Sequence, residues 1–259
     1  MKPVCLIIGA GAGIGGHVGK RFARDGYHII LSRRSDASGL ENLVKDIVQD
    51  GGSAEGRLLN IVDENAIEDL IHDIEKNSGP IEVVVHNIGA QIGNRRLTDT
   101  SLKTFELGWR LSCFSLFRLA YTVLPLMAQR GKGTLLVTSS TAAQRGNAGQ
   151  HSHAAAMGGR RMLCQSLNAE FASQNIHVAH IVIDGAVDAP DTLGKMLGPE
   201  AFEKLRKDKG SEDGLMLPEH IAETYFHIAQ QHRSVWTHEL DLRSFSDEAW
   251  WNHAVNIEF

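Results

Sequence analysis

Short runs of hydrophobic residues alternate along the chain with longer segments in which the apolar positions follow the helical period. The strand-like runs are 4–8, 28–31, 54–61, 81–85, 133–138 and 176–183. The helix-like segments are 18–25, 40–49, 63–77, 102–129 and 151–174. Strands rich in Val, Ile and Leu that alternate with helices are typical of a parallel sheet covered on both faces. We therefore predict an α/β fold with a doubly wound parallel sheet, the Rossmann fold.

The chain contains no internal repeat, low-complexity tract or linker that would divide it, so we expect a single domain over residues 1–259. A C-terminal extension, 218–259, departs from the alternation, with a helix to about Gln231 and then the segments 236–243 and 246–259. Three of the four tryptophans lie in this extension: Trp236, Trp250 and Trp251. So aromatic a tail is expected to pack on the body of the protein or on a partner.

The overall composition narrows the classes of partner. A formal net charge of −5 offers no basic field for nucleic acid or for an anionic membrane surface. The three cysteines are scattered and none forms a Cys-x-x-Cys pair, which favours a reducing cytoplasm. No metal is expected, because the 13 histidines show no metal-ligand spacing. We also expect no membrane-spanning segment, and therefore a cytoplasmic protein that acts on a small molecule.

The glycine-rich turn Gly9–Gly16 follows the first strand and opens the first helix. Its glycines can be grouped as 9, 13 and 15 or as 11, 13 and 16, and the end of the strand at Ile8 favours the first grouping. Glycines allow a pyrophosphate to approach the backbone and the free N–H groups of a helix N-terminus. We predict a dinucleotide site that includes Gly9, Ala12, Gly13, Ile14 and Gly15.

An ordered series of motifs resembles the short-chain dehydrogenase/reductase family. The glycine turn is followed by His86-Asn87-Ile88-Gly89 after the fourth strand and Ser139-Ser140 after the fifth. Asp184-Gly185, with Val187-Asp188, then follows the sixth strand, and the resemblance covers roughly residues 4–190. It implies an oxidoreductase with a nicotinamide cofactor, contacted by Asn87, Gly89, Gly185 and Val187.

The end of the second strand predicts which cofactor binds. A site for NAD usually carries Asp or Glu there, whereas this chain reads Leu31-Ser32-Arg33-Arg34. Because guanidinium groups bind phosphate bidentately, Arg33 and Arg34 favour NADP(H) through its 2′-phosphate. The resemblance also places Asn60, with Ile61 beside it, at the adenine.

The family's catalytic pattern is only partly present. Counting from Ser140, the family's Tyr position falls on His153 and its Lys position on Met157, and the family's Asn position falls on Ser112. Histidine, with an unperturbed pKa of about 6.5, is suited to general acid catalysis without a neighbouring lysine. Ser140 and His153 are therefore the candidate catalytic residues. Arg160-Arg161 can be surface residues or a partial replacement for the lysine. Arg95-Arg96 can receive an anionic substrate, although solvated loop arginines are the favoured interpretation.

The sequence is compatible with two functions. One is an NADP(H)-dependent reductase of a carbonyl or alkene, and the other is a catalytically silent NADP(H)-binding scaffold or sensor; a subunit that assembles with an active paralogue is a third, weaker option. The variable segment 189–214 is expected to select the substrate. The helix around 102–129 carries Trp109, Phe114, Phe117 and Tyr121, more aromatic surface than one sheet face needs. By the family resemblance we expect a homodimer or homotetramer.

Overall fold

The computed structural model describes residues 2–89 and 95–249, so Trp250 and Trp251 lie outside the described residues. One seven-stranded sheet runs through the single domain, and all the strand pairs are parallel. The strand order is β3-β2-β1-β4-β5-β6-β7, the doubly wound arrangement predicted from the sequence. The strands are β1 Val4–Ile8, β2 His28–Arg33, β3 Ser53–Leu58, β4 Ile81–His86, β5 Gly133–Ser140, β6 Ile176–Asp184 and β7 Glu239–Arg243.

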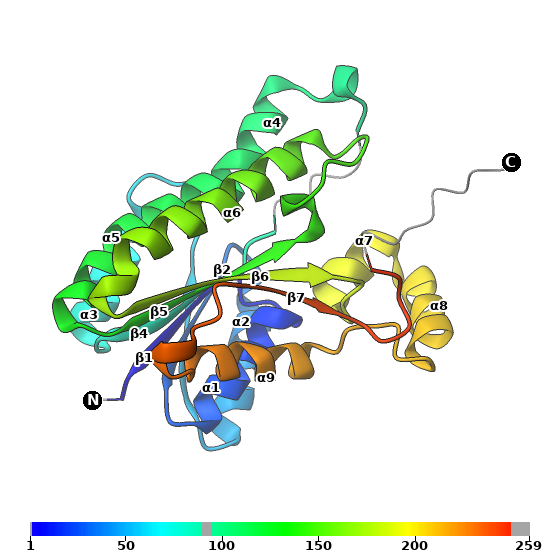
Figure 1. Ribbon diagram of the computed structural model, residues 1–259. Helices are drawn as coiled ribbons and strands as arrows, with labels where there is room; N and C mark the ends of the chain where they lie inside the picture. Colours follow the sequence, from blue (N-terminus) through cyan, green and yellow to red (C-terminus); the bar gives the residue numbers. More distant parts are fainter. Residues whose placement is uncertain (1, 90–94, 250–259) are drawn as a thin grey trace, which may run out of the picture.

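Helices cover both faces of this sheet (Figure 1). The main helices are α1 Ile14–Arg24, α2 Ala37–Gln49, α3 Ala66–Asn77, α4 Leu102–Trp109, α5 Ser115–Arg130, α6 His151–Phe171, α8 Pro199–Gly210 and α9 Pro218–Ala229. The short α7, Lys195–Leu197, and α8 lie beyond the carboxyl ends of the strands (Figure 1). They belong to the segment 189–214 that the sequence singled out.

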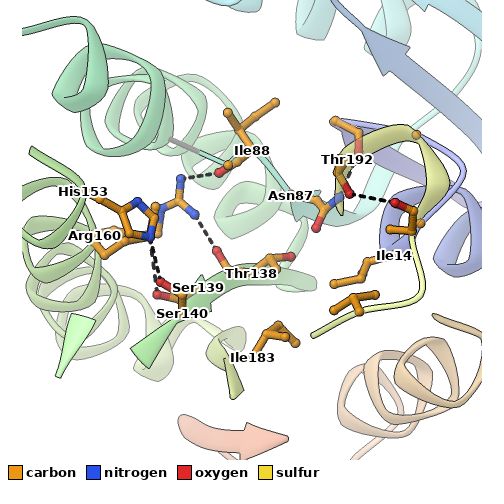
Figure 2. A pocket seen from close by; sticks show the side chains of 18 residues that line it. Ile14, Asn87, Ile88, Thr138, Ser139, Ser140, His153, Arg160, Ile183 and Thr192 are labelled. Carbon is orange, nitrogen blue, oxygen red and sulfur yellow. Dashed lines mark hydrogen bonds between the residues drawn. The ribbon is translucent and has the colours of Figure 1, made fainter. Parts of the chain in front are cut away.

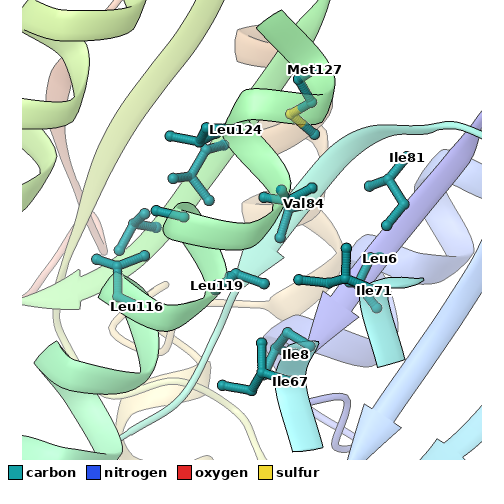
Figure 3. Close-up of a cluster of buried hydrophobic side chains, with 14 of the residues drawn as sticks. Leu6, Ile8, Ile67, Ile71, Ile81, Val84, Leu116, Leu119, Leu124 and Met127 are labelled. Carbon is teal, nitrogen blue, oxygen red and sulfur yellow. The ribbon is translucent and has the colours of Figure 1, made fainter. Parts of the chain in front are cut away.

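The two hydrophobic cores follow from the alternation of side chains along each strand. Leu6 and Ile8 of β1 face α3 and α5, where they meet Ile71 and Leu119 (Figure 3). Ile7, the residue between them, belongs to the opposite core with α1, α2 and α9. A strand buried on both faces must be apolar at every position, which is why the sequence of β1 reads as a continuous hydrophobic run.

The predicted helix 102–129 is interrupted. α4 and α5 are separated by a π-helical turn over Arg110–Phe114, which contains the buried Ser112. By length and composition alone, the stretch Leu102–Arg130 is long and apolar enough to cross a membrane. In the fold, however, its residues Leu116, Leu119 and Val123 are buried against the sheet, as in the core helix of a globular domain.

The C-terminal extension continues the alternation, so the prediction that it departs from it was wrong. α9 covers the face shared with α1, and β7 adds a seventh parallel strand beside β6. Trp236 packs on the body as expected, with its ring stacked at 4.8 Å on that of His177. β7 reads Glu-Leu-Asp-Leu-Arg, and this polar alternation suits an edge strand.

Candidate functional site

A cleft of about 330 Å³ opens at the carboxyl ends of the central strands, where the strand order reverses between β1 and β4. Figure 2 shows the cleft with Ser140, His153 and Arg160 on one side and Ile14 and Thr192 on the other. The described wall consists of Gly9, Gly11, Gly13, Ile14, Gly15, Asn87, Ile88, Gly89, Thr138, Ser139, Ser140, His153, Met157, Arg160, Ile183, Val187, Ala189 and Thr192. Most of the predicted cofactor and catalytic positions therefore share one concave surface.

Three glycines of the turn are required by close contacts. Gly9 has a φ of +97°, and a Cβ built on it would lie 2.4 Å from the carbonyl oxygen of Asn87. A Cβ on Gly15 would lie 2.4 Å from the carbonyl oxygen of Gly9, and one on Gly13 would lie 2.8 Å from the Cβ of Ala189. Gly11, by contrast, has room for a side chain. These contacts support the grouping 9, 13 and 15, although Gly16 also lies tightly against the turn.

The turn presents the N-terminus of α1 to the cleft. α1 begins at Ile14, its N-cap Gly13 provides no side-chain acceptor, and its first turn contains no acidic residue. The first N–H groups of a helix have no partner within the helix and attract anions. Asn87 holds the turn from the neighbouring strand, because its Nδ2 donates to the carbonyl oxygen of Gly9 at 2.9 Å. A helix N-terminus placed in this way is the kind of site that binds a phosphate group.

The second predicted anion-binding group lies at the end of β2. The side chain of Arg33 is 13% exposed and pairs with two carboxylates, Asp36 at 3.1 Å and Asp191 at 3.3 Å. Asp191 also accepts a hydrogen bond from the N–H of Ala12. Arg34 is exposed. The structure therefore brings Arg33 and Ala12 together through Asp191, and Ala12, Arg33 and Arg34 all lie outside the described wall of the cleft.

The remaining predicted cofactor contacts are less directly placed. Asn60 follows β3 and donates through Nδ2 to Asp63 at 2.7 Å, and Ile61 is buried. Gly185 follows β6, close to Met216. None of the three belongs to the described wall of the cleft, so their contacts with a cofactor stay predictions.

The candidate catalytic pair lies at the other end of the cleft. β5 ends at Ser140 and α6 begins at His151, so His153 occupies the first turn of that helix. The Oγ of Ser140 and the Nε2 of His153 are 3.1 Å apart, within hydrogen-bond distance (Figure 2). His151 is directed elsewhere, with its Nε2 at 3.0 Å from Oγ1 of Thr100. A hydroxyl and an imidazole in contact can pass a proton between them.

The positions predicted to replace the family's Lys and Asn are also in contact. Met157 is buried one helical turn after His153, and its sulfur accepts from the hydroxyls of Ser112 at 3.9 Å and Ser139 at 3.8 Å. The site has a neutral thioether where the family pattern has an ammonium group.

A buried cation lies one turn further along α6. Arg160 is 1% exposed and donates to the backbone carbonyls of Ile88, Ser112 and Thr138. Among the described residues, no ion pair involves Arg160. Burial lowers the pKa of Arg160 to about 10, so the guanidinium stays charged at neutral pH. Its neighbour Arg161 instead forms a bidentate pair with Glu239.

The sequence left the role of Arg160 open, although its spacing carried a signal. Positions 153, 157, 160 and 164 follow the helical spacing i, i+4, i+7 and i+11, so they share one face of α6. Met157 and Cys164 are apolar members of this stripe, and an arginine between them is expected to be buried. Arg95 and Arg96 are exposed and not part of the described wall of the cleft.

Comparison with known proteins identifies the class. The profile of the short chain dehydrogenase family matches residues 3–193, well over half of the chain. The protein therefore belongs to the short-chain dehydrogenase/reductase family, and its oxidoreductase class follows from that membership.

Two relatives are 28–29% identical to this chain over about three quarters of their length. The 7alpha-hydroxysteroid dehydrogenase of Escherichia coli K12 is 29% identical over 200 residues, which cover 77% of this chain and 76% of that protein. The 3-oxoacyl-acyl-carrier-protein reductase FabG of Thermotoga maritima is 28% identical over 189 residues, covering 73% of this chain and 76% of that protein.

Solved structures agree with the fold over almost the whole chain. A short-chain dehydrogenase from Rhodopseudomonas palustris superposes with a TM-score of 0.78 at 28% identity, covering 94% of this chain and 99% of that one. A 7 alpha-hydroxysteroid dehydrogenase complexed with NADH and 7-oxo glycochenodeoxycholic acid superposes with a TM-score of 0.80 at 26% identity, covering 93% and 92%.

Proposed function

We propose that this protein is an NADP(H)-dependent oxidoreductase that reduces a carbonyl or alkene of a small molecule, with Ser140 and His153 as its catalytic residues. The contact of 3.1 Å between these two side chains, at the end of a cleft that begins at the glycine turn, carries the proposal. A related protein of the same fold was solved with NADH and an oxo compound, which supports a cofactor and a carbonyl substrate side by side.

The cofactor assignment rests on charge and shape. The N-terminus of α1 would hold the pyrophosphate, with Gly9, Gly13 and Gly15 leaving room for it. Arg33 would bind the 2′-phosphate of NADP(H) with its fork of N–H donors. β2 ends in Ser32-Arg33, without the Asp or Glu that accepts hydrogen bonds from the ribose hydroxyls in sites for NAD(H), and the nearby carboxylates of Asp36 and Asp191 pair with Arg33.

NADPH supplies a hydride when it is bound, and the chain supplies the proton. The hydroxyl of Ser140 donates a hydrogen bond to the substrate oxygen and polarises the double bond. Protonated His153 gives its proton to that oxygen, directly or through Ser140, which passes on its own proton and receives the one from Nε2. The oxygen ends as a hydroxyl and His153 ends neutral, ready to be protonated again by solvent.

Arg160 acts through the backbone as a positioning residue. By donating to Thr138 it fixes the end of β5 that carries Ser140, and by donating to Ile88 it fixes the turn after Asn87. One guanidinium thereby ties the chain after β4 to the end of β5, which replaces part of the positioning that the family's lysine provides.

The second candidate function is a silent NADP(H)-binding scaffold or sensor. The buried thioether of Met157 favours it, because an uncharged group there gives the cofactor weaker positioning than an ammonium. If catalysis has been lost, the glycine turn, Arg33 and Asn87 still suffice for binding.

The role of His153 is tested by its alanine variant and the pH dependence of turnover. We expect NADPH oxidation with an activated carbonyl to rise as the pH falls, since the protonated imidazole is the donor. His153→Ala should lower the rate by about 10²- to 10⁴-fold and remove this pH dependence. His151→Ala is the matched control, because His151 lies in the same helical turn but contacts Thr100. An unchanged rate in His153→Ala would remove His153 from the mechanism.

A further inference from the structure

The segment that follows β6 folds back over the glycine turn. It forms a π-helical turn, Pro190–Gly194, that continues into α7. Ala189 approaches the turn so closely that a Cβ on Gly13 would lie 2.8 Å from its methyl group. Figure 2 shows Thr192 beside Ile14, across the cleft from Ser140 and His153. The segment is thus in direct contact with the predicted phosphate cradle.

The carboxylate of Asp191, a residue of this segment, lies in the predicted phosphate cradle. Its Oδ2 accepts from the backbone N–H of Ala12 and from Nη2 of Arg33, both at 3.3 Å. Its other oxygen, Oδ1, is 3.7 Å from the ammonium group of Lys195 on the same segment. A single carboxylate oxygen therefore bridges the glycine turn and the end of β2.

The two donors that Asp191 occupies are among those proposed to bind the cofactor. Arg33 is the group assigned to the 2′-phosphate, and a phosphate oxygen would seek the same donors as the carboxylate oxygen. Two anions cannot share this position without strong repulsion. Asp36 also pairs with Arg33, but its carboxylate caps α2 by accepting from the N–H of Gly39, so it is held in place by the helix.

We propose that Asp191 is a specificity-determining residue that occupies the 2′-phosphate subsite in the free protein and competes with NADP(H) for Arg33. This inference rests on the proposed binding of NADP(H). NAD(H) has a hydroxyl in place of the phosphate and can bind while Asp191 keeps its contact with Arg33. NADP(H) must displace the carboxylate. Asp191 therefore reduces the difference in affinity between NADP(H) and NAD(H) that Arg33 creates. Release of the Asp191 carboxylate from Arg33 is coupled to movement of the segment 189–197.

A neighbouring aspartate provides a control for the loss of charge. Asp188 lies three residues earlier and accepts from Nε and Nη2 of Arg206 on α8, at 2.9 and 2.7 Å. Asp188→Asn removes one negative charge from the same segment and weakens its attachment to α8, but the carboxylate of Asp191 stays on Arg33. Asp191→Asn removes the competing charge and keeps a side chain of the same size.

The test uses adenosine 2′,5′-bisphosphate as the probe and adenosine 5′-monophosphate as its partner, titrated by calorimetry into the full-length protein. We expect Asp191→Asn to bind the bisphosphate about three- to tenfold more tightly than the wild type, with the monophosphate within about twofold. Asp188→Asn should show neither change.

Three results would overturn the proposal: no gain for the bisphosphate, including no binding to either protein; an equal gain for the monophosphate; or the same gain in Asp188→Asn. The proposed reductase activity fails separately. If Asp191→Asn binds the bisphosphate more tightly but the protein turns over no substrate, the proposed role of Asp191 is still supported. If the protein turns over a substrate but Asp191→Asn does not bind the bisphosphate more tightly, only the role of Asp191 is rejected.

Discussion

At the scale of single residues, the site depends on polar groups that are buried among partners distant in sequence. Arg160 is the clearest case, because a guanidinium removed from water needs hydrogen bonds from every side to offset its lost hydration. It finds them in carbonyl groups of three separate segments. These hydrogen bonds offset the cost of burying the charge and join the segments that carry Ile88, Ser112 and Thr138.

Arg160→Met should therefore destabilise the protein by about 3 kcal/mol or more, because several carbonyl groups lose their donors at once. Arg161→Met, one residue on, breaks a partly exposed pair with Glu239 and should cost less than about 1 kcal/mol. Urea denaturation of both variants compares the two free energies of unfolding. Similar decreases in the free energy of unfolding of the two variants would show that the buried guanidinium contributes no more to stability than that of Arg161.

Arg33→Ala should weaken the binding of NADPH by about tenfold, which is the low end of the range for hydrogen bonds to a charged group. The low end applies because Arg33 already pairs with Asp36 and Asp191 in the free protein. The binding of NADH should change little. Calorimetry with both cofactors measures this, and Arg34→Ala, at an exposed position, should have the smaller effect. Equal losses for NADPH and NADH would contradict the assignment of Arg33.

The local sequence pattern predicted the glycine turn but could not predict the contact of Asp191 with that turn. Gly9, Gly13 and Gly15 are dictated by a turn between a strand and a helix, so a short stretch of sequence suffices. The contact between Ala12 and Asp191 joins residues separated by 179 positions, and it exists only because two loops meet above the sheet. Composition and spacing do not report such a contact.

At the scale of elements, the sequence predicted helices and strands where the hydrophobic period was strong. It missed the π-helical turn at 110–114, because π-helical turns are rare and occur mostly as single turns inside α-helices. It also missed β7 as a member of the parallel sheet, because an edge strand alternates polar and apolar residues. β7 is tied to its neighbours by Glu239, which contacts both His180 and Arg161.

Two buried histidines, His180 on β6 and His86 on β4, should make the stability of the protein sensitive to acid. Burial lowers the pKa of His180 to about 4 even though Glu239 opposes the shift, and burial also holds the pKa of His86 well below its usual range. Both imidazoles therefore bind protons more weakly in the folded than in the unfolded protein. Stability should be constant above about pH 6.5, the unperturbed value, and fall as the pH drops from there towards 4.

Each such histidine should lower the free energy of unfolding by up to about 1.4 kcal/mol per pH unit within this window. Urea denaturation at a series of pH values between 7 and 5 measures the slope. His180→Gln retains a donor for Glu239 but cannot be protonated, so its slope should be shallower than that of the wild type. An identical slope would mean that His180 does not contribute.

At the scale of the whole molecule, the surface of α4 and α5 is unusually apolar. Leu102 is 89% exposed and Tyr121 is 73% exposed, and Trp109, Phe114 and Phe117 lie between them in sequence. Trp109 stacks on Phe114 and Phe117 stacks on Tyr121, so these rings pack on one another along the helices. An exposed apolar surface of this kind suits a second copy of the chain.

We predict a homodimer or homotetramer in solution, assembled through this surface. Light scattering at micromolar concentration should give a multiple of the 28.4 kDa chain mass. Tyr121→Glu should shift the protein towards the monomer, and Phe245→Glu, an exposed aromatic outside these helices, is the matched control. A monomeric mass for the wild type would reject the assembly.

Whether this cleft reduces a substrate with NADPH can be measured as the oxidation of NADPH in the presence of a panel of aldehydes, ketones and activated alkenes. We expect slow oxidation by the wild type with at least one member of the panel. It also predicts that the double variant His153→Tyr, Met157→Lys works faster if only the acid–base groups limit the rate, although Arg160 will oppose a second charge one helical turn away. No oxidation by either protein, with NADPH bound to both, would contradict the reductase and leave a silent cofactor-binding protein.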